Sequence, residues 1–112
     1  MNFYDKIHET VRAFRQTEEF KEFLKLKEEI KKDEKLYAML KDNKDKQKEH
    51  QMKYLSGNKI EESETQNMQN LYSIIIQNEK ARKLLECEMK LDVMLADLQK
   101  IIGDGIKEIV EF

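Results

Sequence analysis

The chain has 112 residues, of which 39% are charged and 39% hydrophobic. Its 21 lysines and arginines nearly balance its 23 aspartates and glutamates, so the net charge of −2 gives no basis for long-range electrostatic steering. Proline is absent and glycine occurs only at Gly57, Gly103 and Gly105, whereas β-sandwiches and barrels need frequent turn residues. We therefore predict a single all-α domain over residues 1–112.

The same arithmetic excludes several classes of protein. Cys87 is the only cysteine, so it cannot form an internal disulfide, and no Cys–His cluster exists for a structural zinc ion. Residues 1–15 carry both acidic and basic side chains, unlike a signal peptide. The longest apolar stretch, Leu71–Ile76, is too short to cross a membrane. We expect a cytoplasmic protein without membrane insertion.

Two short helices are predicted over residues 3–32. Asn2 is placed to cap the first helix and Thr17 the second, because both residue types are favoured at helix N-caps. The apolar residues of the first helix recur at helical spacing and are Phe3, Ile7, Val11 and Phe14.

A helical hairpin is predicted over residues 34–77. Asp33 is placed to cap its first helix, which then runs to about Ser56. Gly57 follows in the position where a left-handed residue commonly ends a helix. The hairpin therefore turns at Gly57.

The second helix of the hairpin is predicted to start between Ile60 and Ser63, and Ser63 has capping-box spacing with Gln66. Asn78 either caps a further helix or marks a kink in one long helix, and the sequence leaves both alternatives open. Residues 78–112 are assigned to a C-terminal core and oligomerisation helix, which Gly103-Asp104-Gly105 is expected to break or fray.

The hairpin is apolar at its base and polar at its tip. On the first helix, the stripe that faces the second is apolar at its start and polar from Asn43 onward: Leu36, Leu40, Asn43, Gln47, His50 and Tyr54. The second helix reverses this order, so folding back at Gly57 pairs polar half with polar half. We therefore expect the tip of the hairpin to be hydrated.

The C-terminal helix has an apolar arc of about 200°, although a core-facing stripe needs little more than about 100°. A helix that is apolar on two sides packs against neighbours on both, and so small a chain supplies few neighbours. We therefore predict a homodimer or higher oligomer. The residues predicted for its interface are Leu84, Cys87, Leu91, Met94, Leu95, Leu98, Ile101 and Ile102.

No catalytic, cofactor or metal site is predicted. Acid–base chemistry needs titratable groups that converge in a dry pocket, whereas the carboxylates here fall on polar helix faces. His8 and His50 are the only histidines, and we interpret both as ordinary surface or interface residues rather than ligands. Cys87 lies between Glu86 and Glu88, which disfavour its thiolate, so we expect an inert thiol.

Glu88 is predicted to be a buried polar residue within the apolar stripe of the C-terminal helix. Burial of an unpaired carboxylate is costly, so its partner must lie on another element. A hydrogen bond that fixes the register between helices is favoured over a contact to a metal or ligand.

Nucleic-acid binding is the alternative function. A lysine-rich run in the hairpin provides cations for phosphate contacts, and an adjacent tyrosine can stack on a base. Interleaved acidic residues oppose this interpretation, so any such binding should be weak and salt-sensitive. The candidate surface for RNA or another partner is Lys44, Lys46, Lys48, Lys53 and Tyr54.

The order of several segments resembles the YheA/YmcA/YlbF-like family of bacterial helical proteins, and the YheA branch in particular. The segments that carry the resemblance are Asn2-Phe3-Tyr4-Asp5, Thr17-Glu18-Glu19-Phe20, Asp33-Glu34, Asn78-Glu79-Lys80 and Leu84-Leu85-Glu86-Cys87-Glu88, followed by Leu91, Met94-Leu95, Leu98 and Ile101-Ile102.

The resemblance implies a small, self-associating all-α protein without enzymatic activity. The YmcA and YlbF branches regulate competence, sporulation and biofilm formation, in a complex that influences RNA processing through a membrane-bound ribonuclease. That complex has been linked to iron–sulfur clusters held by cysteines near the C-terminus of those branches. Because Cys87 is the only cysteine here, we expect no such cluster on one chain.

Overall fold

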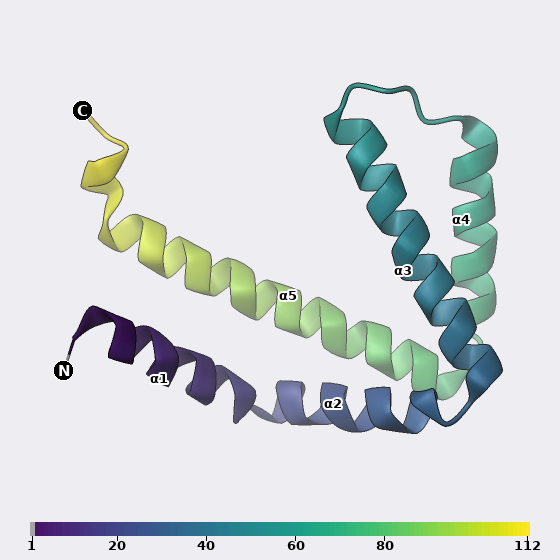
Figure 1. The fold of residues 1–112 in the computed structure, drawn as a ribbon, viewed down its shortest axis with the longest axis horizontal. Coiled ribbons are helices and arrows are strands. Elements are labelled where there is room, and N and C mark those ends of the chain that lie inside the picture. The colour runs from purple at the N-terminus through teal and green to yellow at the C-terminus, as the bar shows by residue number, and fades with distance from the viewer. Residues whose placement is uncertain (1) are drawn as a thin grey trace. The chain divides into compact units, whose positions relative to one another are not determined.

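The computed structural model describes residues 2–112 and contains no β-strand within them, which confirms the predicted all-α fold. None of the helices in this range is long and apolar enough to span a membrane. The elements, in chain order, are α1 (Phe3–Arg15), α2 (Glu18–Lys31), α3 (Glu34–Leu55), α4 (Glu62–Ile75), α5 (Glu79–Gly105) and the 3₁₀ turn η1 (Lys107–Ile109) (Figure 1).

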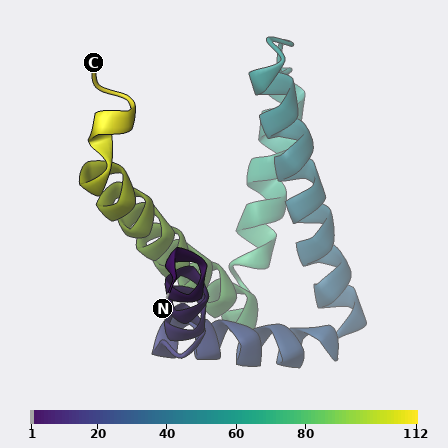
Figure 2. The same ribbon diagram turned by 60° about the vertical axis from the view of Figure 1, so that its left-hand side comes forward.

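The chain contains two compact units, and each combines parts of several helices. The hairpin unit is Lys25–Leu84 and contains α3 and α4, which lie side by side (Figure 2). The terminal unit combines Met1–Leu24 with Leu85–Phe112. The unit borders fall within α2 and α5 rather than at the ends of helices.

Four helices begin at side chains that cap them. Asn2, Thr17, Asp33 and Asn78 each accept a hydrogen bond from the backbone N–H three residues later, at 2.9, 3.3, 3.1 and 3.0 Å respectively. These bonds satisfy N–H groups that have no partner within the helix. The first three caps confirm the predictions, and the fourth shows that Asn78 begins a separate helix.

The turn of the hairpin follows the end of α3. Gly57 has φ of +77°, the left-handed conformation predicted for it. Its neighbour Asn58 donates its N–H to the Lys53 carbonyl at 2.9 Å, which satisfies a carbonyl at the helix end. α3 ends at Leu55, one residue before the expected Ser56.

α4 begins within the predicted range of residues 60–63, but its N-cap differs from the expected one. Glu61 is the N-cap and makes no side-chain capping bond, and the helix begins at Glu62. Ser63 therefore lies inside the first turn rather than at the cap, so the predicted capping box with Gln66 is wrong. At the other end of the chain, Gly103 is helical and α5 breaks only after Gly105.

The core of the hairpin unit lies at the base of α3 and α4. Ile75 and Ala81 have no exposed surface. Full burial of a side chain as large as that of Ile75 contributes about 1.5–3 kcal/mol. The other buried apolar residues of this unit are Leu26, Ile30, Leu36, Leu40 and Leu84.

The terminal unit has a smaller core. Phe14 meets Phe20 edge to face, with ring centroids 5.7 Å apart, and the Arg15 guanidinium lies 4.9 Å from the centre of the Phe20 ring. On α5, Cys87 and Leu91 are buried. α1 contributes no buried residue, although its apolar residues recur on one face.

Replacement by alanine should have opposite effects on stability at Gly57, which has a positive φ, and at Gly103, which is helical. Neither Gly57 nor Gly103 has an atom within 4 Å of an added Cβ, so the substitutions differ only in backbone conformation. We expect Gly57→Ala to cost about 1 kcal/mol because of its positive φ, whereas Gly103→Ala should stabilise α5 by about 0.5–1 kcal/mol. Urea unfolding of both variants measures this difference, and equal midpoints would contradict it.

Candidate functional site

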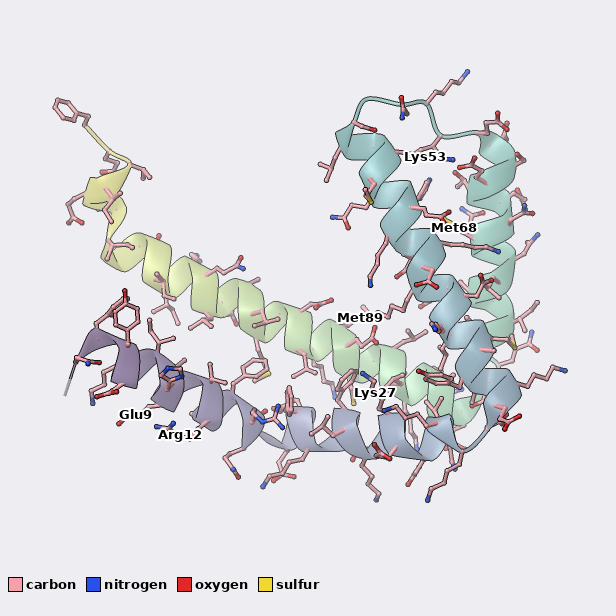
Figure 3. The ribbon with its side chains drawn as sticks, viewed as in Figure 1. Glu9, Arg12, Lys27, Lys53, Met68 and Met89 are labelled. Atoms are coloured by element: carbon pink, nitrogen blue, oxygen red, sulfur yellow. The ribbon has the colours of Figure 1, made fainter. Side chains whose placement is uncertain are left out.

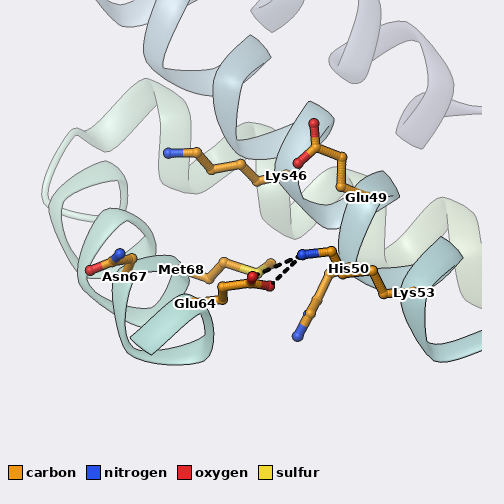
Figure 4. A pocket seen from close by; sticks show the side chains of 7 residues that line it. All are labelled: Lys46, Glu49, His50, Lys53, Glu64, Asn67 and Met68. Carbon is orange, nitrogen blue, oxygen red and sulfur yellow. Dashed lines mark hydrogen bonds and ion pairs between the residues drawn. The ribbon is translucent and has the colours of Figure 1, made fainter. Parts of the chain in front are cut away.

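The seam between α3 and α4 is crossed by an ion pair. The Lys53 ammonium donates to both carboxylate oxygens of Glu64, at 2.8 and 3.0 Å (Figure 4). This hydrogen bond is the main cause of the raised pKa of Lys53, so the stabilisation holds at neutral pH and is lost only as the pH rises through that pKa. Both side chains are about 40% exposed, so the pair is screened by salt.

A cavity of about 230 Å³ lies beside this ion pair. Met68 of α4 and Lys53 of α3 lie between the two helices (Figure 3). Charged groups dominate this side of the seam. The residues that line the cavity are Lys46, Glu49, His50, Lys53, Glu64, Asn67 and Met68 (Figure 4).

The seam also contains two buried polar atoms without a partner. Among the residues that the structure describes, nothing bonds to the Asn43 side-chain nitrogen or to Nε2 of His50. Asn43 is only 2% exposed and is the one buried polar residue found in residues 2–112. An unpaired buried amide typically costs about 1–3 kcal/mol, so this arrangement needs an explanation.

The predicted lysine surface is not a cluster of free cations. Lys46 pairs with Asp42 at 3.1 Å and Lys53 pairs with Glu64, while Lys44 also has an interaction within the chain. Tyr54 is 75% exposed at the tip, and Lys48 is exposed too. The structure therefore neutralises part of the positive charge on which nucleic-acid binding would depend.

The residues predicted for the oligomer interface divide into two groups along α5. Leu84, Cys87 and Leu91 are buried within the chain. The same face continues as Leu95 and Ile102, which are 43% and 52% exposed. The other members are Met94 and Leu98, which are half-buried, and Ile101, which is 70% exposed.

Further exposed apolar residues lie outside the predicted interface. Met89, labelled in Figure 3, and Val93 are 64% and 60% exposed. Their spacing of four residues places them on a second face of α5. On α1, Phe3 is 71% and Val11 51% exposed. The i, i+4 spacing of Met89 and Val93 is visible in the sequence, but both residues lie outside the apolar arc from which the interface was predicted.

Glu88 is half-buried, not buried as predicted, and it has an interaction within the chain. The physical reason is its direction on the helix. At about 100° per residue, Glu88 points roughly 100° away from the buried Cys87, at the edge of the apolar stripe.

The structure offers no constellation for metal chemistry within residues 2–112, because no three His, Cys, Asp or Glu side chains converge there. His8 is exposed on α1. Cys87 is 7% exposed, and its burial, followed by the charge of Glu22, raises the pKa of its thiol.

The raised pKa of Cys87 predicts slow thiol chemistry. At pH 8 the folded protein should react with a disulfide reagent at least about tenfold more slowly than the urea-unfolded chain, because burial limits both thiolate and access. The rate should rise with pH, because the thiolate is the reacting form and folding favours the protonated thiol. Equal rates for folded and unfolded protein would contradict the assignment.

Comparisons with known proteins support a family assignment. Residues 3–107 match the family described as "Control of competence regulator ComK, YlbF/YmcA". A UPF0342 protein of Caldicellulosiruptor bescii is 42% identical over 106 residues, covering 95% of this chain and 89% of the relative. The UPF0342 protein YheA of Bacillus subtilis is 30% identical over 109 residues, covering 97% and 93%.

A solved structure has the same fold. It is described as a protein of unknown function (DUF964) from Bacillus stearothermophilus. Its TM-score to this chain is 0.82 with 24% sequence identity, over 96% of this chain and 95% of the other.

Proposed function

The chain belongs to the YlbF/YmcA family, with UPF0342 proteins such as YheA among its relatives, and from this membership we propose that it is a non-enzymatic, homo-oligomeric protein that acts through protein–protein interactions. A regulatory role, such as the family description states for competence, is the role we assign to those interactions.

The observation that carries self-association is apolar surface that the terminal unit leaves uncovered. Along one face of α5, burial ends after Leu91 while the apolar face continues through Leu95 and Ile102. α1 in the same unit has no buried residue, and Phe3, Ile7 and Val11 on its apolar face are 71%, 41% and 51% exposed. Apolar surface of this extent in a small chain is typical of an interaction site. A second copy carries the same surface and can cover it in a two-fold arrangement.

The alternative is an RNA-associated factor that uses the lysine-rich part of the hairpin. Tyr54 supports it, because an exposed ring can stack on a base. The ion pairs of Lys46 and Lys53 count against it, because binding phosphate would first require breaking them. We therefore place it second.

Replacement of Ile101 by lysine tests self-association through the terminal unit. Ile101 is 70% exposed, so Ile101→Lys leaves the core of one chain intact but places a charge in the proposed interface. In sedimentation velocity we expect an oligomer for the unchanged protein and the 13.5 kDa monomer for the variant. Gln99→Lys adds the same charge at an exposed polar position roughly 160° around the helix from Ile101, so it is the control and should remain oligomeric.

A monomer for the unchanged protein at micromolar concentration would refute the proposed self-association. The same holds if Gln99→Lys and Ile101→Lys dissociate it equally, since a general charge effect would then explain the result.

Filter binding of single-stranded RNA over a salt series tests the alternative. Counterion release makes the logarithm of the affinity fall with the logarithm of salt concentration in proportion to the number of phosphates contacted. We expect no specific binding and little salt-dependent retention. Tight retention that is lost in Lys48→Glu would instead favour the RNA-associated function.

A further inference from the structure

Lysines and acidic residues alternate in sequence along the middle of α3 but lie on different faces of the helix. The acidic row, formed by Asp42, Asp45 and Glu49, follows three lysines at one residue's distance. Consecutive residues of an α-helix point about 100° apart, so the lysines form a separate row. Alternating spacings of four and three residues place that row about 100° around α3 from the seam, and we refer to it as the lysine stripe: Tyr37, Lys41, Lys44, Lys48, Gln51 and Leu55.

The positive charge of the lysine stripe is only partly neutralised within the chain. Lys44 has an interaction within the chain. Among the residues that the structure describes, the exposed Lys41 and Lys48 side chains make no ion pair or hydrogen bond. The neighbouring Asp42 pairs instead with Lys46, on a third face of α3, at 3.1 Å. The stripe therefore presents two unpaired ammonium groups seven residues apart, or about 10 Å along the helix axis.

Exposed apolar side chains lie at both ends of the lysine stripe. Tyr37 is 40% exposed near the base of the hairpin, and Leu55 is 74% exposed at its tip, where the adjacent Met52 is 70% exposed. The stripe is about 27 Å long between these ends. Tyrosine and methionine are enriched in protein interfaces. The stripe thus combines apolar groups at its two ends with positive charge between them.

The narrow width and the charge of the lysine stripe select its occupant. A row of residues at alternating spacings of three and four is the line along which a second helix packs. A flat anionic membrane would also meet the acidic row on the next face, and like charges repel. A chain of RNA phosphates would find cations only in the middle of the stripe and leave its apolar ends uncovered. A helix with carboxylates at its centre and apolar residues at both ends matches the whole stripe.

We propose that the lysine stripe binds an acidic amphipathic helix of a different protein, with carboxylates opposite Lys41, Lys44 and Lys48 and apolar side chains opposite Tyr37 and Leu55. This inference rests on the proposed function, because it names a surface and a partner chemistry for the protein–protein interactions proposed above. The apolar ends provide affinity, and the charges at the centre select an acidic partner over a basic one.

Binding of a designed peptide to the full chain tests the proposal. The probe is a fluorescein-labelled, hydrocarbon-stapled helix of about 20 residues, with leucines at both ends of one face and glutamates between them. A peptide of the same composition with leucines and glutamates on opposite faces is the control. In fluorescence anisotropy we expect the probe to bind at least about tenfold more tightly than the control, and more weakly as salt rises. Chemical shifts of ¹⁵N-labelled protein should change mainly within residues 37–55.

Charge reversal at selected positions of α3 separates the lysine stripe from the net charge of the chain. The double variant Lys41→Glu/Lys48→Glu should bind the probe at least about tenfold more weakly, because carboxylates then face carboxylates. Lys35→Glu/Lys46→Glu makes the same change in charge at exposed positions roughly 120–160° around the helix, and should keep the affinity within about twofold. A probe with lysines in place of its glutamates should restore binding to the first variant. Circular dichroism checks that both variants remain helical.

Equal binding of the two peptides, equal loss in the two double variants, or no binding to the unchanged protein would overturn the proposal. Displacement of the probe by single-stranded RNA or by phosphatidylglycerol vesicles would overturn it too, because the stripe would then bind phosphate. The outcome is separable from self-association, which sedimentation measures without the peptide. An oligomer that does not bind the probe refutes the helix docking alone, and a monomer that binds it refutes self-association alone.

Discussion

Packing at the base of α3 and α4 is the interaction on which the hairpin unit depends. Ile75 and Ala81 are fully buried there, with Leu36 and Leu40 on α3. Above this base the seam changes character at Asn43, and the next heptad positions are occupied by Gln47 and His50. Hydrophobic burial therefore holds the hairpin at one end only. The upper half is held by the exposed Lys53–Glu64 pair and by few apolar contacts, which is why it leaves room for cavities and unpaired polar atoms.

The two units leave surfaces of different chemistry uncovered. In the terminal unit the uncovered surface is apolar, as at Phe3 and Ile101. Along one side of the α3–α4 seam it is polar but uncharged, with amides and tyrosines lining it. Apolar burial supplies affinity with little directional preference, whereas buried amides penalise every alignment that leaves them unpaired. Under the proposed self-association, the apolar surface would supply affinity and the amides would restrict the geometry of the contact.

Local features of the fold were predictable from the sequence, whereas burial was predictable only in part. The caps at Asn2 and Asp33 and the turn at Gly57 depend on a few neighbouring residues, so sequence alone identified them. Ser63 was wrongly assigned to a capping box because two acidic residues precede it: Glu61 is the N-cap and the helix begins at Glu62. Glu88 was predicted to be buried because hydrophobic periodicity locates the centre of an apolar stripe on a helix more accurately than the edges of that stripe. The lack of a partner for Asn43 depends on what faces it across the seam, and spacing along one helix does not contain that information.

The short connection of the hairpin has a consequence for the order of folding and assembly. Only residues 56–61 separate α3 from α4, so closing this loop costs little chain entropy, and the contacts it brings together are local in sequence. The chain also lacks proline, which removes slow prolyl isomerisation as a kinetic step. The hairpin can therefore close within one molecule well before a second one arrives by diffusion. Exchange of α4 between chains is then disfavoured, so the proposed self-association would join preformed hairpins rather than domain-swapped ones.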